Sequence, residues 1–116
     1  MAYVDGFVLP VPRKNLKTYW RMARGGRRMW LKAGALDYKE CVGDDLNPKF
    51  GLSFRRMAKV KPGETVIFAY IVYRSRAHRD RVNARVMKLM DAGSMGMEMP
   101  FSVKRMGYGG FKVVVG

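Results

Sequence analysis

Apolar and polar residues follow two periods along this chain, one typical of strands and one typical of helices. Residues 64–73 form an apolar run rich in aromatic and β-branched side chains, which predicts a strand. The run leads directly into residues 76–90, where Ser75 stands at the N-cap position of a predicted helix. The apolar stripe of this helix contains His78, Val82, Val86 and Leu89. The helix is expected to close at residues 91–93.

The first third of the chain repeats this order of elements. Residues 3–11 predict a strand that ends at Pro10 and Pro12, because proline cannot donate a ladder hydrogen bond. Residues 35–42 predict a second strand. Between them, apolar residues near helical spacing predict a helix from a cap at Asn15 to about Ala33. These residues are Leu16, Tyr19, Trp20, Ala23 and Trp30.

Glycines mark the soft point and the end of this first helix. Gly25 and Gly26 each weaken a helix by about 1 kcal/mol relative to alanine, so we expect a kink there. Gly34 supplies the C-terminal stop.

The remaining segments are connections and a final strand. Residues 44–63 are too long for a simple hairpin, and we expect a short strand over 53–60 within them. A methionine-rich loop is expected over 93–104, followed by a last strand over 106–115. Neither connection has a pattern strong enough to predict its path.

The predicted order, βαβ followed by βαβ, is that of the α+β ferredoxin-like fold. This fold is a four-stranded antiparallel sheet with both helices on one face. Strand 64–73 is apolar on both faces, one of which carries Val66, Phe68, Tyr70 and Val72. Since two helices cover only one side, the other side needs a second cover. A second copy of the chain, packed sheet against sheet as a dimeric α/β-barrel, is the simplest cover.

Length and composition predict one cytoplasmic domain. The 116 residues suit a single domain over 1–116 with one core. No apolar stretch approaches the roughly 20 residues that span a bilayer, so no membrane partner is expected. The first residues lack the basic region of a signal peptide. The single cysteine excludes an internal disulfide and suits a reducing compartment.

The charge of the chain is strongly positive, with 23 basic and 9 acidic residues and a net charge of +14. Residues 13–32 hold eight basic residues and no acidic one, and residues 74–88 hold six, opposed only by Asp80. Such a field attracts polyanions, although it equally suits solvated helix faces. The candidate contacts to RNA or DNA are Arg21, Arg24, Arg28, Arg76, Arg79, Arg81 and Arg85.

Two carboxylates interrupt otherwise apolar strands and are the first candidates for chemistry. Asp5 and Glu40 must each be paired or lie in a wet cavity, because an unpaired buried charge is costly. If their strand faces line the space between two sheets, either one is a candidate acid or base. The alternative is an ion pair with a neighbouring Lys or Arg.

Tyrosines and one histidine complete the candidate set. Tyr38, Tyr70 and Tyr108 supply flat walls and hydrogen bonds for a ligand. His78 is the only histidine, and its place on the apolar stripe favours a structural role over a general base. With so few His and Cys ligands, we expect neither a metal centre nor a cofactor.

Five segments in order along the chain resemble a family of small bacterial proteins typified by YbaA. They are residues 3–12 (YVDGFVLPVP), 40–45 (ECVGDD), 61–66 (KPGETV), 75–83 (SRAHRDRVN) and 108–111 (YGGF). The resemblance implies a conserved domain of unknown function with the dimeric α/β-barrel form of the ferredoxin-like fold. It implies no catalytic residues.

Two functions are therefore open. One is a homodimer with a cleft for a small molecule, whether or not it is an enzyme. The alternative is a basic module that binds RNA or DNA through its helices. A cavity lined by the carboxylates and tyrosines favours the first, and a continuous basic surface without a cavity favours the second.

Overall fold

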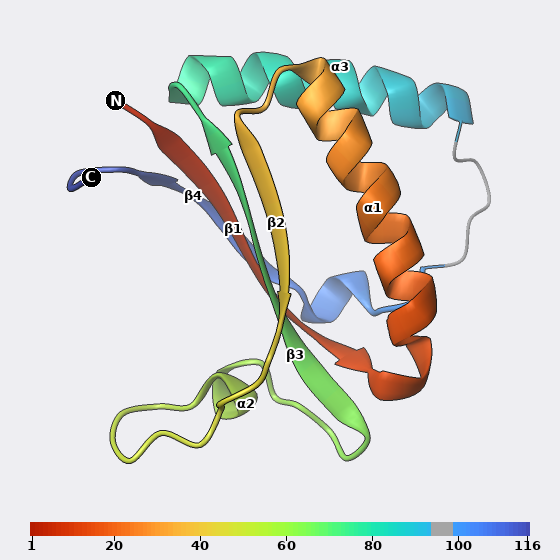
Figure 1. Cartoon of the computed structure of the whole chain (residues 1–116), viewed down its shortest axis with the longest axis vertical. Coiled ribbons are helices and arrows are strands. Elements are labelled where there is room, and N and C mark those ends of the chain that lie inside the picture. Colours follow the sequence, from red (N-terminus) through yellow and green to blue (C-terminus); the bar gives the residue numbers. More distant parts are fainter. Residues whose placement is uncertain (94–98) are drawn as a thin grey trace.

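Four strands form one antiparallel sheet in the computed structural model, which describes residues 1–93 and 99–116, with the backbone alone for 91–93. The strands are β1 (Tyr3–Pro12), β2 (Asp37–Val42), β3 (Glu64–Tyr73) and β4 (Gly107–Lys112). Their order across the sheet is β2-β3-β1-β4 (Figure 1). β1 and β3 pair along their whole length, so these two apolar strands form the centre of the sheet.

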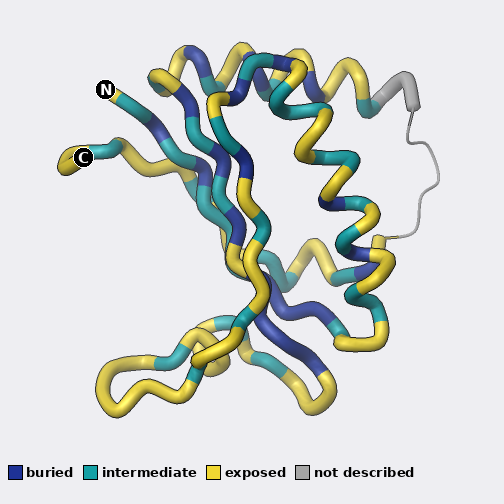
Figure 2. The backbone as a smooth tube through the Cα atoms, viewed as in Figure 1, coloured by how far each residue is buried: buried dark blue, intermediate teal, exposed yellow. Residues whose placement is uncertain are grey.

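Two long helices, α1 (Leu16–Ala33) and α3 (Arg76–Gly93), pack on the same face of this sheet (Figure 1). One core cluster joins α1 to the sheet and contains Leu9, Val11, Tyr19, Ala23 and Ile67. The other joins both helices to the sheet and contains Tyr3, Ala33, Ala35, Tyr38, Ile71, Tyr73, Val82 and Val86. Buried stretches accordingly follow the strands and the inner sides of the helices (Figure 2). The α+β class, the antiparallel sheet and both helices are confirmed.

The strand predicted over 53–60 is wrong, because this segment contains the short helix α2 (Phe54–Met57). Ser53 caps it, with Oγ accepting a hydrogen bond of 3.2 Å from the Arg56 N–H. Two 3₁₀ turns, η1 (Arg13–Asn15) and η2 (Val103–Arg105), complete the fold. Residues 94–98 of the predicted methionine-rich loop lie outside the described part of the chain.

Strand ends differ from the prediction by a few residues. β1 continues through Pro10 to Pro12, opposite Val66 and Glu64 of β3. On its other side β1 pairs with β4 only up to Val8, so both prolines lie where one flank of β1 has no partner, a tolerated position. β2 begins two residues later than predicted, and β4 ends at Lys112 instead of residue 115.

The predicted helix caps are mostly confirmed. Ser75 Oγ accepts a 3.1 Å hydrogen bond from the His78 N–H, and Gly34 ends α1 with a φ of 118°. Asn15 lies at the N-cap position, but its side chain donates to the Pro100 carbonyl at 3.1 Å instead of capping. Leu89 is 47% exposed, and Met90 packs against the core in its place.

A partly buried ion pair joins the start of β3 to η2. Arg105 Nη1 and Nη2 donate to the two carboxylate oxygens of Glu64 at 2.7 and 2.8 Å. The Lys61 N–H donates to the same carboxylate at 2.8 Å. The hydrogen bonds from Arg105 lower the pKa of Glu64 to about 2. Burial of the carboxylate opposes this effect, whereas the Lys61 N–H and the charge of Arg105 add to it.

Candidate functional site

Asp5 on β1 faces the helices and forms a buried ion pair with α3. It is 3% exposed, and Arg79 Nη1 lies 3.0 Å from its Oδ1. The Arg79 guanidinium also lies over the Tyr3 ring, 5.0 Å from its centroid, and its Nη2 is 3.5 Å from the Tyr3 hydroxyl. Burial raises the pKa of Asp5 above its ordinary value, although Arg79 opposes the rise.

A network of neutral hydrogen bonds lies next to the Asp5–Arg79 ion pair. Asn83 Oδ1 accepts from Trp30 Nε1 and from the Tyr73 hydroxyl, both at 3.2 Å. Asp80 lies 2.9 Å from Arg79 Nε, but this nitrogen has no aligned hydrogen bond in the described part of the chain. The region around Asp5 is thus closed by partners from β1, β3 and both long helices.

Glu40 on β2 also faces the helices but has neutral partners. Its Oε1 accepts a hydrogen bond of 2.8 Å from the Tyr19 hydroxyl, and its Oε2 accepts one of 2.7 Å from the Tyr38 hydroxyl. Burial, reinforced by the Glu40 charge, raises the pKa of both tyrosines far above the ordinary value. Two phenols therefore stay protonated and hold one carboxylate.

Gly26 permits this arrangement, and this role differs from the predicted kink. α1 runs without interruption through both of its glycines. A Cβ on Gly26 would lie 3.0 Å from the Tyr38 hydroxyl oxygen, tighter than ordinary packing, whereas one on Gly25 would meet only Arg28 at 4.0 Å. The sequence showed two glycines within a predicted helix, which suggested a kink. In the structure, Gly26 instead allows α1 to approach β2 closely.

A hollow of about 270 Å³ lies beside Glu40, between α1 and β2. We call it the α1/β2 hollow; its lining residues are Trp20, Ala23, Arg24, Arg27, Tyr38, Lys39 and Glu40. Lys39 forms a 2.8 Å ion pair with Asp37 at the surface. The hollow therefore brings together one carboxylate, three cationic side chains and two aromatic rings.

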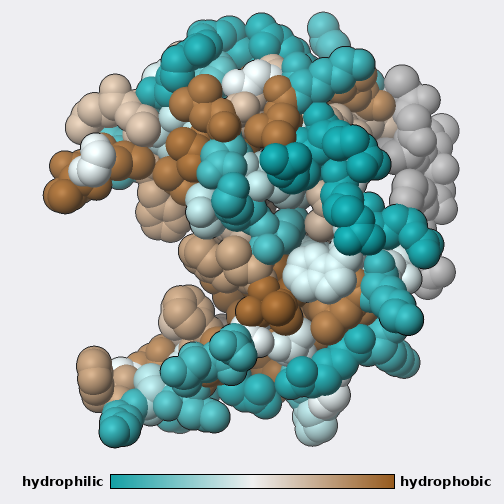
Figure 3. Space-filling model, in the orientation of Figure 1, coloured by the Kyte–Doolittle hydropathy of each residue, from teal (hydrophilic) through white to brown (hydrophobic). Residues whose placement is uncertain are grey.

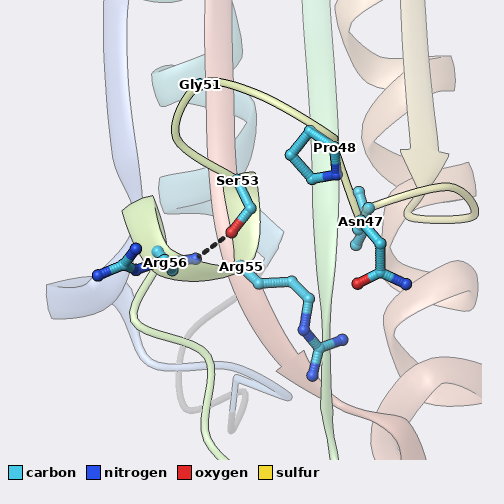
Figure 4. Close-up of a pocket in the computed structure, with 7 residues that line it drawn as sticks. Asn47, Pro48, Gly51, Ser53, Arg55 and Arg56 are labelled. Atoms are coloured by element: carbon cyan, nitrogen blue, oxygen red, sulfur yellow. Dashed lines mark hydrogen bonds between the residues drawn. The ribbon is translucent and has the colours of Figure 1, made fainter.

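A second hollow, of about 390 Å³, is formed by the connection between β2 and β3. Asn47, Pro48, Ser53, Arg55 and Arg56 are among its lining residues (Figure 4). The Arg56 side chain points away from Asn47 and Pro48, so the two arginines do not converge on one point (Figure 4). None of the residues singled out in the sequence lies here.

The other candidate residues lie apart from both carboxylates. His78 is buried, and its Nδ1 accepts a 3.0 Å hydrogen bond from the Arg74 N–H. Burial, and then the charges of Arg74 and Arg81, lower the pKa of His78. Tyr70 lies on the opposite face of the sheet, where its ring is 6.0 Å from Phe68.

Tyr108 on the edge strand β4 is 70% exposed and stacks on Phe7 at 5.8 Å. Within the described single chain, the candidate carboxylates and tyrosines therefore lie in different places. The pairing register explains the difference: Asp5 and Glu40 are on the helix face of their strands, and Tyr70 is on the open face. Only Tyr38 and Glu40 meet.

The open face of the sheet carries exposed aromatic side chains. Phe68 on β3 and Phe111 on β4 are 43% and 62% exposed. Phe54 of α2 approaches Phe68, with 6.5 Å between ring centroids, and covers part of this face. The two-sided apolar pattern of β3 is real, and in the described chain its second side is only partly covered.

The seven predicted nucleic-acid contacts divide into two groups. Arg79 pairs with Asp5, and Arg85 Nη1 donates to the Ala33 carbonyl at 2.8 Å. The other five are exposed: Arg21, Arg24, Arg28, Arg76 and Arg81. Hydrophilic side chains cover α3 and α1 in Figure 3. Arg27, which the sequence did not single out, lines the α1/β2 hollow, and its neighbour Arg28 does not.

The described residues contain neither a candidate membrane span nor a candidate metal site. No helix there has both the length and the apolar character needed to cross a bilayer. The same residues contain no group of three or more His, Cys, Asp or Glu side chains placed to hold a metal ion.

Comparisons with known proteins place the chain among relatives without a stated activity. A family model described as "Protein of unknown function (DUF1428)" matches residues 2–103. The "Uncharacterized protein YbaA" of Escherichia coli (strain K12) is 36% identical over 115 residues, covering 99% of this chain and 98% of that protein. The protein of that name from Shigella flexneri has the same identity and coverage. Among solved structures, the "De novo designed protein Foldit4" has 12% identity and a TM-score of 0.45, covering 97% of this chain and 99% of its own.

Proposed function

The chain belongs to the family described as "Protein of unknown function (DUF1428)", and from this premise we propose that it is a homodimer that binds a small molecule in the α1/β2 hollow. The observation that carries the binding function is Glu40, a carboxylate fixed by two phenol hydrogen bonds at the wall of a hollow. A polar group that is fixed beside an open space, with aromatic walls, is what small-molecule sites have in common.

The ferredoxin-like fold and its dimeric barrel form are part of this proposal. The element order βαββαβ, with α2 inserted, supports the first, as does the packing of both long helices on one face. The dimeric barrel form is supported by the open face of the sheet, where the exposed side chains of Phe68 and Phe111 need a cover.

Charge supports a second copy of the chain as that cover. The chain carries a net charge of +14, and the basic residues of α1 and α3 are concentrated on the helix side. Two copies that met through their helices would repel each other, whereas the apolar open faces would meet with little repulsion. Association through the open faces therefore buries aromatic surface and keeps the two basic sides apart.

Light scattering after gel filtration tests the dimer. We expect twice the chain mass of 13.3 kDa at micromolar concentration. Phe68→Glu should give a folded monomer, because it places a charge in the proposed interface. Phe50→Glu is the matched control, since Phe50 is a strongly exposed phenylalanine outside the sheet. A monomeric wild type, or a Phe68→Glu variant that remains dimeric, would refute this interface.

A thermal-shift screen with a mixed panel of small carbonyl, aromatic and phosphate compounds tests the binding function. At least one compound should stabilise the wild type, because a ligand that binds only the folded state raises the melting temperature. The same compound should raise the melting temperature of Glu40→Gln by less than that of the wild type, and that of Asp5→Asn by the same amount. Each rise is measured relative to the variant without the compound. A confirmed response that Glu40→Gln leaves unchanged would remove Glu40 from the site.

A reducing, cytoplasmic location belongs to the same proposal. Cys41 is the only cysteine of the chain, and it is exposed. An exposed single thiol remains free in a reducing compartment, whereas an oxidising one favours its pairing between chains. Fractionation of cells that produce the protein would test the location.

Nucleic-acid binding remains a second candidate, because seven arginines of the two long helices are exposed, the five described above together with Arg27 and Arg85. Contacts of this kind go mainly to phosphates, so affinity should fall steeply with salt and depend little on sequence. Arg76→Gln with Arg81→Gln should weaken binding of a labelled duplex more than Lys49→Gln with Lys104→Gln, two exposed lysines outside the long helices. Equal losses, or no binding at low salt, would speak against a helix-face site.

A further inference from the structure

The α1/β2 hollow has the size of one substituted ring. Its volume is about 270 Å³, and an apolar protein cavity of about 150 Å³ is large enough for benzene. The walls include Trp20, whose indole stands edge-on to the Tyr19 ring with 5.4 Å between centroids. A flat ring with one or two substituents fits this space.

The cationic side chains of the hollow favour an anionic ligand. Lys39 already pairs with Asp37 at 2.8 Å. Arg24 and Arg27 line the hollow from α1, and within the described residues neither has an ion pair or a side-chain hydrogen bond. Guanidinium groups bind carboxylates through two parallel hydrogen bonds, so the two arginines suit a carboxylate.

Glu40 favours a hydrogen-bond donor on the same ligand. Each of its oxygens accepts one phenol hydrogen bond. A carboxylate oxygen has a second lone-pair site, so each oxygen can accept another donor. Since Tyr19 and Tyr38 are neutral donors, they fix the carboxylate without neutralising its charge, and a ligand hydroxyl would meet a full negative charge.

These three observations, taken with the proposed small-molecule function on which they depend, specify a ligand class. We propose that the α1/β2 hollow binds a single-ring aromatic carboxylate that carries a hydroxyl group. The ring lies against Trp20, the carboxylate meets Arg24 and Arg27, and the hydroxyl donates to Glu40.

The two tryptophans of the chain allow a direct test by NMR of the ¹⁵N-labelled, full-length protein. Trp20 lines the hollow, whereas the Trp30 Nε1–H is held by Asn83 at 3.2 Å and serves as an internal control. Titration with 4-hydroxybenzoate should shift the Trp20 indole N–H signal in a saturable way and leave that of Trp30 unchanged. Benzoate, which lacks the hydroxyl, and 4-hydroxybenzyl alcohol, which lacks the carboxylate, should each bind more weakly.

Three substitutions on one helix sharpen the test. Arg24→Gln and Arg27→Gln should each raise the Kd for 4-hydroxybenzoate by about tenfold, which corresponds to about 1.4 kcal/mol for the loss of a hydrogen bond between charged groups. Arg28→Gln removes the same charge from the residue next to Arg27 but outside the hollow, and should leave the Kd within about twofold.

Three results would overturn the proposal, and they differ in what else they affect. If 4-hydroxybenzoate leaves Trp20 unshifted while another compound of the thermal-shift panel shifts it, the ligand class is wrong and the site stands. If no compound shifts Trp20, both the ligand class and the binding function fail. Equal losses for Arg27→Gln and Arg28→Gln would also overturn it, because the binding would then reflect net charge alone.

Discussion

Asp5 and Glu40 occupy similar places in the sequence pattern and very different surroundings in the fold. Both are acidic residues of apolar strands, and both face the helices. Asp5 is almost fully buried against the cation Arg79. Glu40 is half-buried, accepts two neutral hydroxyls and borders the α1/β2 hollow. The first carboxylate is used by the fold itself, whereas the second has an open space beside it, where we propose that a ligand binds.

The partner of each carboxylate explains this difference. A cation close to a buried carboxylate compensates its charge, and both groups then depend on each other for stability. Neutral donors orient a carboxylate and leave its net charge in place. A buried carboxylate is therefore a good candidate site when its partners are neutral and a hollow lies beside it.

The largest expected difference between the two regions is in stability. Asp5→Asn should lower the free energy of unfolding by about 3 kcal/mol, because it removes the buried partner of Arg79 and leaves only the exposed Asp80. Glu40→Gln should cost only about 1 kcal/mol, since the amide can still pair with both hydroxyls. Urea denaturation followed by circular dichroism measures both values. Equal losses would mean that the two carboxylates have the same structural role.

Matched tyrosine substitutions should show a smaller contrast. Tyr38→Phe removes a 2.7 Å hydrogen bond to Glu40 and should cost about 1–2 kcal/mol. Tyr3→Phe removes only a 3.5 Å contact with Arg79 and keeps the ring under the guanidinium, so it should cost less than about 0.5 kcal/mol. The same denaturation measurement applies. A larger loss of stability for Tyr3→Phe than for Tyr38→Phe would mean that the Tyr3 hydroxyl makes the stronger contact.

Acid titration should reveal the contribution of the ion pair between Glu64 and Arg105. The pKa of Glu64 is lowered from 4.5 to about 2, so its pair stabilises the fold above pH 4.5 and is lost as the pH falls towards 2. After allowance for solvent screening, this loss should be about 1–2 kcal/mol. The free energy of unfolding of Glu64→Gln, measured as a function of pH, should not show this loss at low pH. If the variant shows the same loss, Glu64 is not its cause.

The smallest expected effect distinguishes the two glycines of α1. Gly25→Ala should stabilise the protein by up to about 1 kcal/mol, because alanine favours the helix and its Cβ meets only the end of Arg28. Gly26→Ala should gain less or lose stability, since its Cβ crowds the Tyr38 hydroxyl at 3.0 Å. Thermal melts compare the two variants. Equal gains would show that Tyr38 moves aside without cost.

Local patterns predicted the long elements because their causes are local. The alternation of β3 and the cap at Ser75 are both visible within a few residues. Helix α2 escaped prediction because four residues show no period, and its stability depends on the Ser53 cap and on Phe54 packing against Phe68.

The candidate site was predictable only in part. Glu40 attracts attention as an acid in an apolar strand, but its contact with Tyr19 joins a strand to a helix and depends on how they pack. Arg27 lines the hollow and Arg28 does not, because α1 is rotated about its axis so that Arg27 faces β2. The apolar stripe in the sequence predicts this rotation only approximately. The partner of Asp5 comes from α3, far along the chain, and no spacing rule indicates it.

The place of β1 at the centre of the sheet has a consequence for how the chain folds during synthesis. β1 hydrogen-bonds to β3 and to β4, and both are translated after α1 and β2. At roughly 5–20 residues per second, the ribosome needs several seconds to bring β3 out after β1. Through this interval the apolar side chains of β1 have no strand partner, and contacts so distant along the chain also form slowly. The nascent chain is thus most exposed to aggregation before β3 emerges, and synonymous changes that slow translation between residues 43 and 63 should lower the yield of folded protein.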